Sequence, residues 1–143
     1  MFLTLSEFEE HLLNMTQRDW QPLLELIPEI EKTEVFSEEK GGEEVRPGVF
    51  TFPYHDNSKV VEDFVQVAYR IRIVINFDWP GWDEGRSLAS GDLELIDNID
   101  LITACKLITA LIRNDRFCDG ALAESFESGL MLRILKRVKV LVG

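Results

Sequence analysis

A nearly continuous apolar run reads Leu101-Ile102-Thr103-Ala104-Cys105-Lys106-Leu107-Ile108-Thr109-Ala110-Leu111-Ile112. Only three of its side chains, Thr103, Lys106 and Thr109, are polar. A helix that is apolar on most sides has no face to offer to water, so it belongs inside a protein core. As a helix the run reaches about 18 Å, which is too short for the ~30 Å hydrocarbon core of a bilayer. We therefore predict a central buried helix over about residues 97–113, with Leu107, Ile108 and Leu111 fully buried.

The ends of this predicted helix carry suitable charges. Asp97 can cap its first turn, and Asp100 lies near the positive end of the helix dipole. Arg113 and Arg116 lie at or just past its end, where positive charge is favourable.

The remaining helical patterns indicate an all-α fold, a single domain over residues 1–143 with six or seven helices packed around the central one. The other predicted helices cover residues 5–14, 17–32, 59–76, 78–88, 119–128 and 130–141. Pro28 should bend or restart the second of them, because proline cannot continue a helix interior. Residues 59–76 also alternate like a strand, but their length and a possible cap at Ser58 favour a helix. A two-stranded edge is the alternative for that segment.

The charge of the chain is uneven. The net charge is −11, and residues 1–48 hold 12 acidic and 4 basic side chains, a net of −8. Such a balance opposes non-specific attraction to DNA or to anionic lipid. Residues 34–48 are rich in glutamate and glycine, which predicts an acidic, solvated loop. The aromatic run 49–54 that follows is expected to lie extended across the core.

The cysteines and the first residues point to a reducing compartment. Cys105 and Cys118 are the only cysteines, too few for a disulfide framework or a zinc quartet. The first five residues run into glutamates without a basic region, so no signal peptide is visible. A cytoplasmic protein with reduced thiols is expected.

Two blocks of the sequence are distinctive together. One is Phe77-Asp78-Trp79 with Trp82, preceded by Pro53-Tyr54. The other begins Thr109-Ala110-Leu111-Ile112-Arg113-Asn114-Asp115-Arg116-Phe117 and runs on to Ile134-Leu135-Lys136-Arg137. Over about residues 16–142, without the acidic loop, they resemble a bacterial family described only as a domain of unknown function, family 6508. The resemblance implies a small, mostly helical bacterial protein, favours a helix over 59–76, and implies no activity.

One candidate site is aromatic. Tyr54, Trp79 and Trp82, with Phe52, form a group that can line a ligand pocket or anchor a partner, where tryptophan and tyrosine are frequent. The same residues can also simply cover the core, with their polar atoms bonded to nearby carbonyls. Covering the core is the more common role for such residues, by a small margin.

A second candidate site combines carboxylates with arginines. Arg113, Asp115, Arg116 and Glu127 lie close together in sequence and can hold a metal or a phosphate ester. Ion pairing at helix ends is the more common role for such groups, with Glu127 opposite Arg113 or Arg116 and Asp119 as a helix cap.

Catalytic signatures are missing from the sequence. It has no glycine-rich phosphate loop, no Gly-x-Ser-x-Gly elbow and no CxxC, and its two histidines, His11 and His55, lie far apart. We predict no catalytic residue, no bound metal and no cofactor.

The last predicted helix carries four bases and no acids: Arg133, Lys136, Arg137 and Lys139. With the helix before it, this helix loosely resembles a helix-turn-helix, but its first residues are Leu130, Met131 and Leu132, where a recognition helix needs polar side chains. Nucleic acid is therefore an unexpected partner. We expect the bases to be balanced by the acidic N-terminal helices or by the acidic segment of a neighbouring subunit.

These observations favour a binding or protein-interaction module without catalytic activity, whose partner is another protein or a second copy of the chain, and not a membrane. One alternative is an enzyme that acts on a phosphate-containing or nucleotide ligand through the Arg113–Glu127 group. The other is a helix-turn-helix-like DNA-binding protein.

Overall fold

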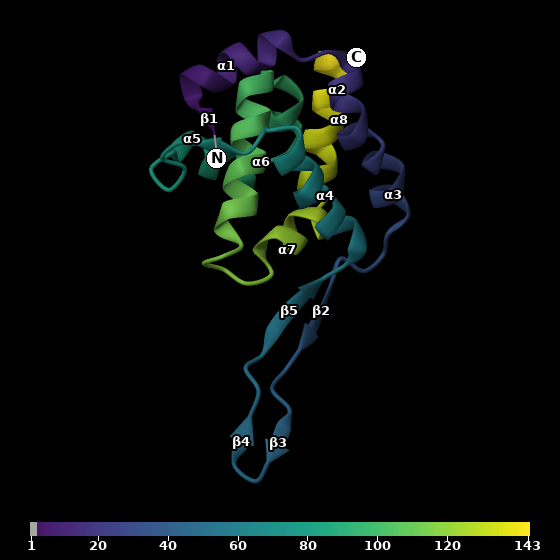
Figure 1. Ribbon diagram of the computed structural model, residues 1–143, viewed down its shortest axis with the longest axis vertical. Helices are drawn as coiled ribbons and strands as arrows, with labels where there is room; N and C mark the ends of the chain where they lie inside the picture. The colour runs from purple at the N-terminus through teal and green to yellow at the C-terminus, as the bar shows by residue number, and fades with distance from the viewer. Residues whose placement is uncertain (1–2) are drawn as a thin grey trace.

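The computed structural model describes residues 3–143, which are mostly helical, as predicted (Figure 1). The described helices are α1 (Leu5–Asn14), α2 (Gln17–Leu24), α3 (Leu26–Lys32), α4 (Lys59–Arg70), α5 (Asp83–Ser90), the 3₁₀ helix η1 (Leu93–Asn98), α6 (Leu101–Asn114), α7 (Ala121–Glu127) and α8 (Leu130–Val142). The described strands are β1 (Leu3–Thr4), β2 (Ser37–Lys40), β3 (Glu44–Arg46), β4 (Val49–Phe50), β5 (Tyr54–Asn57) and β6 (Ile75–Asn76). The expected six or seven helices are thus eight α-helices among these residues, because the helix predicted over 17–32 is divided into α2 and α3. The expectation that the chain has no signal peptide rests partly on Met1 and Phe2, which lie outside the described residues.

Helices α6 and α8 provide much of the core. Leu107 and Ile108 of α6 are fully buried, as predicted, whereas Leu111 is only half-buried because it faces a surface cavity. Helix α6 contacts α5, α7, α8 and β6, and α8 contacts α2, α3, α6, α7 and η1. That α6 organises the packing of the other helices therefore stays a prediction. Among residues 3–143 no helix has both the length and the apolar character that crossing a membrane requires.

The start of α6 differs from the prediction. The helix begins at Leu101, and the Asp100 side chain caps it by accepting a hydrogen bond from the Thr103 N–H at 2.8 Å. Asp97 belongs instead to the preceding 3₁₀ helix, and its carboxylate pairs with Arg133 of α8. Buried Ile96 and Ile99 explain the separation, because they hold the chain against the core before α6 starts.

The N-terminal helices begin where the sequence indicates. Thr4 with Glu7, and Thr16 with Asp19, form the capping boxes of α1 and α2. The expected break in the 17–32 helix falls at Glu25 rather than at Pro28. Pro28 then lies in the first turn of α3, where its missing N–H has no helical partner to lose.

The helix predicted over residues 59–76 is correct only to Arg70. The chain then turns through Arg72, whose φ of 63° lies in the left-handed region, and continues into β6. Strand β6 pairs in parallel with β1, with Leu3 opposite Ile75. The strand alternative therefore holds for the last residues of this segment, where the contact with the N-terminus supplies the hydrogen bonds.

The predicted acidic loop and the aromatic run after it form a two-stranded arm, residues 37–57, that projects from the helices (Figure 1). Strand β2 pairs antiparallel with β5, and β3 with β4. The expectation of a loop over 34–48 is thus wrong for residues 37–40 and 44–46, which are in strands because their backbone hydrogen bonds come from partners up to 20 residues away. The turns at Gly41 and Gly48 need their positive φ values of 83° and 79°.

The aromatic run does not cross the core. Phe52 is 91% exposed, Phe50 60% and Tyr54 50%. The helices complete their core without these side chains, so the aromatic residues of the arm meet water.

The segment 78–88 was predicted as one helix and is instead a turn followed by α5. Asp78 accepts a hydrogen bond from the Gly81 N–H at 3.2 Å, which closes a turn rather than capping a helix. Helix α5 begins only at Asp83. The turn places Trp79 and Trp82 beside Leu111 of α6, where they line one cavity.

The basic helix α8 lies against the N-terminal helices, as expected, but of its four bases only Lys136 pairs with an acid of those helices among the described residues. It packs against α2 and α3, and the Lys136 Nζ lies 3.6 Å from Glu31 Oε2 of α3. Arg133 pairs with Asp97, and the Arg137 Nε–H donates to the Ile99 carbonyl at 2.8 Å. Leu141, near the end of this helix, is 37% exposed because the last turn extends past the core.

Candidate functional site

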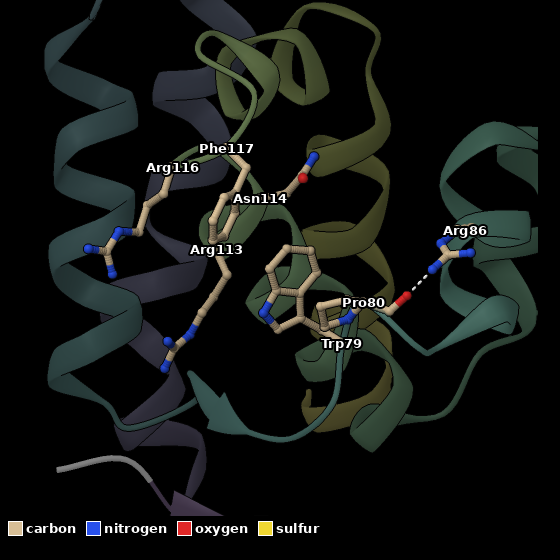
Figure 2. Close-up of a pocket in the computed structure, with 7 residues that line it drawn as sticks. All are labelled: Trp79, Pro80, Arg86, Arg113, Asn114, Arg116 and Phe117. Carbon is tan, nitrogen blue, oxygen red and sulfur yellow. Dashed lines mark hydrogen bonds between the residues drawn. The ribbon is translucent and has the colours of Figure 1, made fainter.

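The end of α6 and the turn before α5 enclose a groove of about 590 Å³, which we call the aromatic–arginine groove (Figure 2). Its lining residues are Trp79, Pro80, Arg86, Arg113, Asn114, Arg116 and Phe117. Three of the residues singled out from the sequence, Trp79, Arg113 and Arg116, therefore lie in one site. The structure adds Phe117, which the sequence analysis did not single out.

The two aromatic rings form the floor of this groove. The ring centroids of Trp79 and Phe117 lie 6.0 Å apart, with a 39° angle between the ring planes. Phe117 is nevertheless 77% exposed, because it follows the end of α6 in a turn that carries it away from the core. Phe117 therefore contacts Trp79 on one side and leaves most of its ring as an apolar surface open to solvent.

The arginines flank the rings on two sides. Figure 2 shows Arg86 beyond Pro80, where its guanidinium donates to the Pro80 carbonyl, and it also pairs with Asp83. On the other side lie the side chains of Arg113 and Arg116. Within residues 3–143 the Arg116 guanidinium makes no ion pair or side-chain hydrogen bond, so its charge is available to an external group.

Trp82 packs nearby against the body of the protein. Its ring makes an edge-to-face contact with Phe77, with centroids 5.6 Å apart at 77°, and the Lys106 Nζ lies 4.4 Å from the Trp82 ring centroid. Gly85 lies against the ring so closely that a Cβ there would sit 2.2 Å from it. Trp82 and Trp79 together line a second, smaller cavity of about 240 Å³ beside Leu111. The structure thus brings the two tryptophans together.

Tyr54 lies elsewhere. It is in strand β5 of the arm, directly opposite Lys40, and it lines neither of the cavities that contain Trp79. The predicted aromatic group is therefore divided: Tyr54 and Phe52 belong to the arm, and Trp79 and Trp82 to the body.

Arg113 and Arg116 also border a groove of about 620 Å³ between α4 and α6, whose lining mixes charged, polar and apolar side chains. Asp115 lines it as well, together with Glu62, Gln66 and Tyr69 of α4 among others. The Asp115 carboxylate accepts a hydrogen bond from the Leu122 N–H at 3.0 Å and so caps the start of α7. Glu127 is exposed and borders neither groove.

Residues 3–143 contain no cluster of side chains suited to binding a metal ion. Among the described residues no group of three or more His, Cys, Asp or Glu side chains is arranged to hold an ion. Cys105 is buried, which raises the pKa of its thiol and leaves it a small apolar side chain, and both cysteines are free.

Sequence reasoning missed a histidine–aspartate pair at the base of the arm. His55 of β5 and Asp119 before α7 meet with 2.9 Å between His55 Nδ1 and Asp119 Oδ2, and the same oxygen accepts from the His55 N–H at 2.7 Å. Gly120 has a φ of 87° and no Cβ, so the His55 ring can lie close to it. A Cβ at this position would be only 3.0 Å from the ring. The pair joins residues 64 positions apart, so nothing local in the sequence indicates it.

The pair shifts the titration of both groups. The hydrogen bond to Asp119 raises the pKa of His55 above its ordinary 6.5, and the same bond lowers the pKa of Asp119 below 3.8. The stabilising attraction between His55 and Asp119 has its full strength between pH 3.8 and pH 6.5, the ordinary pKa values of the two groups. It is lost as the pH rises through the raised pKa of His55, and also as the pH falls through the lowered pKa of Asp119.

We predict that Asp119→Asn lowers the pKa of His55 toward its ordinary value, because the charge that stabilises the imidazolium is gone. An NMR titration of the His55 ring measures this. Asp92→Asn, an exposed carboxylate outside the pair, is the control and should leave the titration unchanged. An unchanged His55 titration in Asp119→Asn would show that the pair does not persist in solution.

The model of the family of unknown function DUF6508 matches residues 15–143, and the chain belongs to this family. The resemblance noted in the sequence is thereby confirmed, and the function of the family is not known. Comparison with curated proteins and with solved structures finds no match.

Proposed function

We propose that the chain is a non-catalytic, single-domain protein-interaction module that binds through its arm and its aromatic–arginine groove. The observation that carries the proposal is the arm, which exposes Phe50, Phe52 and Tyr54 although the helical core is complete without them. A cytoplasmic, bacterial setting is part of the proposal, supported by the two free thiols and by the family resemblance.

The energetics of the arm favour a partner. A two-stranded ribbon by itself is marginally stable in water. Burying one exposed phenylalanine side chain is favourable by ~1.5–3 kcal/mol. A partner that covers Phe50 and Phe52 is therefore bound more tightly and also stabilises the ribbon. The unpaired edges of the arm offer further hydrogen bonds.

The groove carries the residue types that dominate binding energy at interfaces. Tryptophan, tyrosine and arginine are enriched among such hot spots. Trp79, Arg113 and Arg116 lie here with Phe117, and Trp82 supports them from the adjoining cavity.

Two features make the alternatives weaker. The enzyme alternative needs Asp115 and Glu127 beside the arginines, but Asp115 is engaged as a cap and Glu127 borders neither groove. The DNA-binding alternative needs polar side chains at the start of α8, where Leu130 and Met131 are buried.

The proposal predicts that a photo-cross-linking amino acid in place of Phe52 captures a protein at a discrete mass when the chain is expressed in its native cells. The same amino acid in place of Trp79 should also capture a protein. Leu13 of α1, which is 87% exposed on the helical body, is the matched control position and should capture none. The captured protein, once purified, should bind the intact chain in solution, and Phe52→Ser should weaken that binding at least tenfold.

Equal capture at positions 52 and 13 would mean that the arm is no more adhesive than the rest of the surface. Absence of capture at both 52 and 79 would contradict the proposed function.

A further inference from the structure

We propose that the arm of one copy of the chain enters the aromatic–arginine groove of a second copy, so that two copies form a mutual, two-fold dimer. This inference rests on the proposed function and names its partner. It is carried by chemical complementarity between the outer part of the arm and the groove.

The outer part of the arm places carboxylates beside aromatic rings. Glu44 of β3 is directly opposite Phe50 of β4, so the two side chains share one face of the ribbon. Glu43 is adjacent and exposed, and Phe52 follows two residues after Phe50. The arm therefore presents apolar rings with negative charge alongside.

The groove presents the opposite arrangement. The Trp79 and Phe117 rings form an apolar floor, and the Arg116 guanidinium beside it makes no ion pair or side-chain hydrogen bond within the described residues. A volume of about 590 Å³ is several times that of one phenylalanine side chain. Rings of the arm can thus lie on rings of the groove while Glu44 or Glu43 meets Arg116.

The occupant comes from another molecule because the arm is held away from its own body. The ladder of β2 and β5 stiffens it, with an ion pair of 2.7 Å between Lys40 and Asp56, and the His55–Asp119 pair fixes its base. Figure 1 shows the arm extending away from the helices, and only residues of the body line the groove. When each copy inserts its arm into the other, the contact is closed and both arms are covered.

The first test is sedimentation of the purified full-length chain over a range of concentrations. We expect a monomer–dimer equilibrium for the wild type. Phe52→Ser and Arg116→Glu should each raise the dimer dissociation constant at least tenfold. The matched controls are Leu13→Ser for an exposed apolar residue and Lys32→Glu for an exposed base, and neither should change it; circular dichroism checks that all variants are folded.

The second test exchanges the charges. In a dimer of Glu44→Arg, both contacts bring two positive groups together, and in a dimer of Arg116→Glu both bring two negative groups together. In a mixture of the two variants, each of the two contacts pairs opposite charges. Each variant alone should therefore associate at least tenfold more weakly than the wild type, whereas the mixture should recover heterodimers near the wild-type dissociation constant.

The outcomes separate this inference from the proposed function. A wild-type chain that stays monomeric, while position 52 cross-links a different protein, overturns the second-copy partner and leaves the interaction module intact. A dimer that is unaffected by Phe52→Ser and Arg116→Glu, or a variant mixture without recovery, also overturns the inference.

Discussion

Leu107→Ala should lower the free energy of unfolding by about 2–5 kcal/mol, the range found when a buried leucine leaves a cavity. Leu107 is 1% exposed and lies on the helix whose buried side chains also include Ile108 and Ile112. Close-packed neighbours on fixed helices cannot fully collapse into the space that the side chain leaves. Denaturant unfolding, followed by circular dichroism, measures the change.

The same truncation on the surface is the control for this prediction. Leu13→Ala removes the same atoms from a side chain that is 87% exposed, so it should change the free energy of unfolding by less than about 0.5 kcal/mol. If Leu107→Ala were as mild as Leu13→Ala, α6 would not be part of the core.

Thr109→Val should cost about 1–3 kcal/mol of stability, although it keeps the shape of the side chain, because it leaves a buried donor without a partner. The Thr109 hydroxyl is fully buried. It accepts a hydrogen bond from the Ile75 N–H at 3.0 Å and donates to the Cys105 carbonyl at 2.9 Å. Valine cannot accept the hydrogen bond from Ile75, and no water replaces it in a packed interior.

Thr109→Ser distinguishes this cause from a loss of packing. Serine keeps the hydroxyl and removes one methyl group, so the Ile75 amide should remain protected from hydrogen exchange, whereas in Thr109→Val its protection should fall. Equal protection in the two variants would show that the hydrogen bond contributes nothing measurable.

This buried hydroxyl also connects the core to the candidate site. It holds strand β6 against α6, and β6 leads directly into the turn that carries Trp79 and Trp82. If Thr109→Val loosens β6, the turn that follows it should also become more mobile, and with it Trp79 in the aromatic–arginine groove.

The elements that local sequence predicts correctly are those whose hydrogen bonds close within a few residues. The first residues of α1 and α2, the burial of Leu107 and Ile108, and the span of α8 follow from helical periodicity. The family was likewise recognisable, because its blocks are contiguous. Of the candidate site, the sequence indicated Trp79, Arg113 and Arg116 by residue type, without showing that they share a groove.

The features that depended on the tertiary structure all join distant segments. The arm needs the pairing of β2 with β5, and the base of the arm needs His55 to meet Asp119. The short strand β6, in the middle of the chain, needs β1 near the N-terminus. Glutamate and glycine also have no strong local preference for a strand, so the composition of residues 34–48 indicated a loop. The free energy that orders these segments comes from long-range hydrogen bonds and charge pairs, and a local pattern contains no information about which partner arrives.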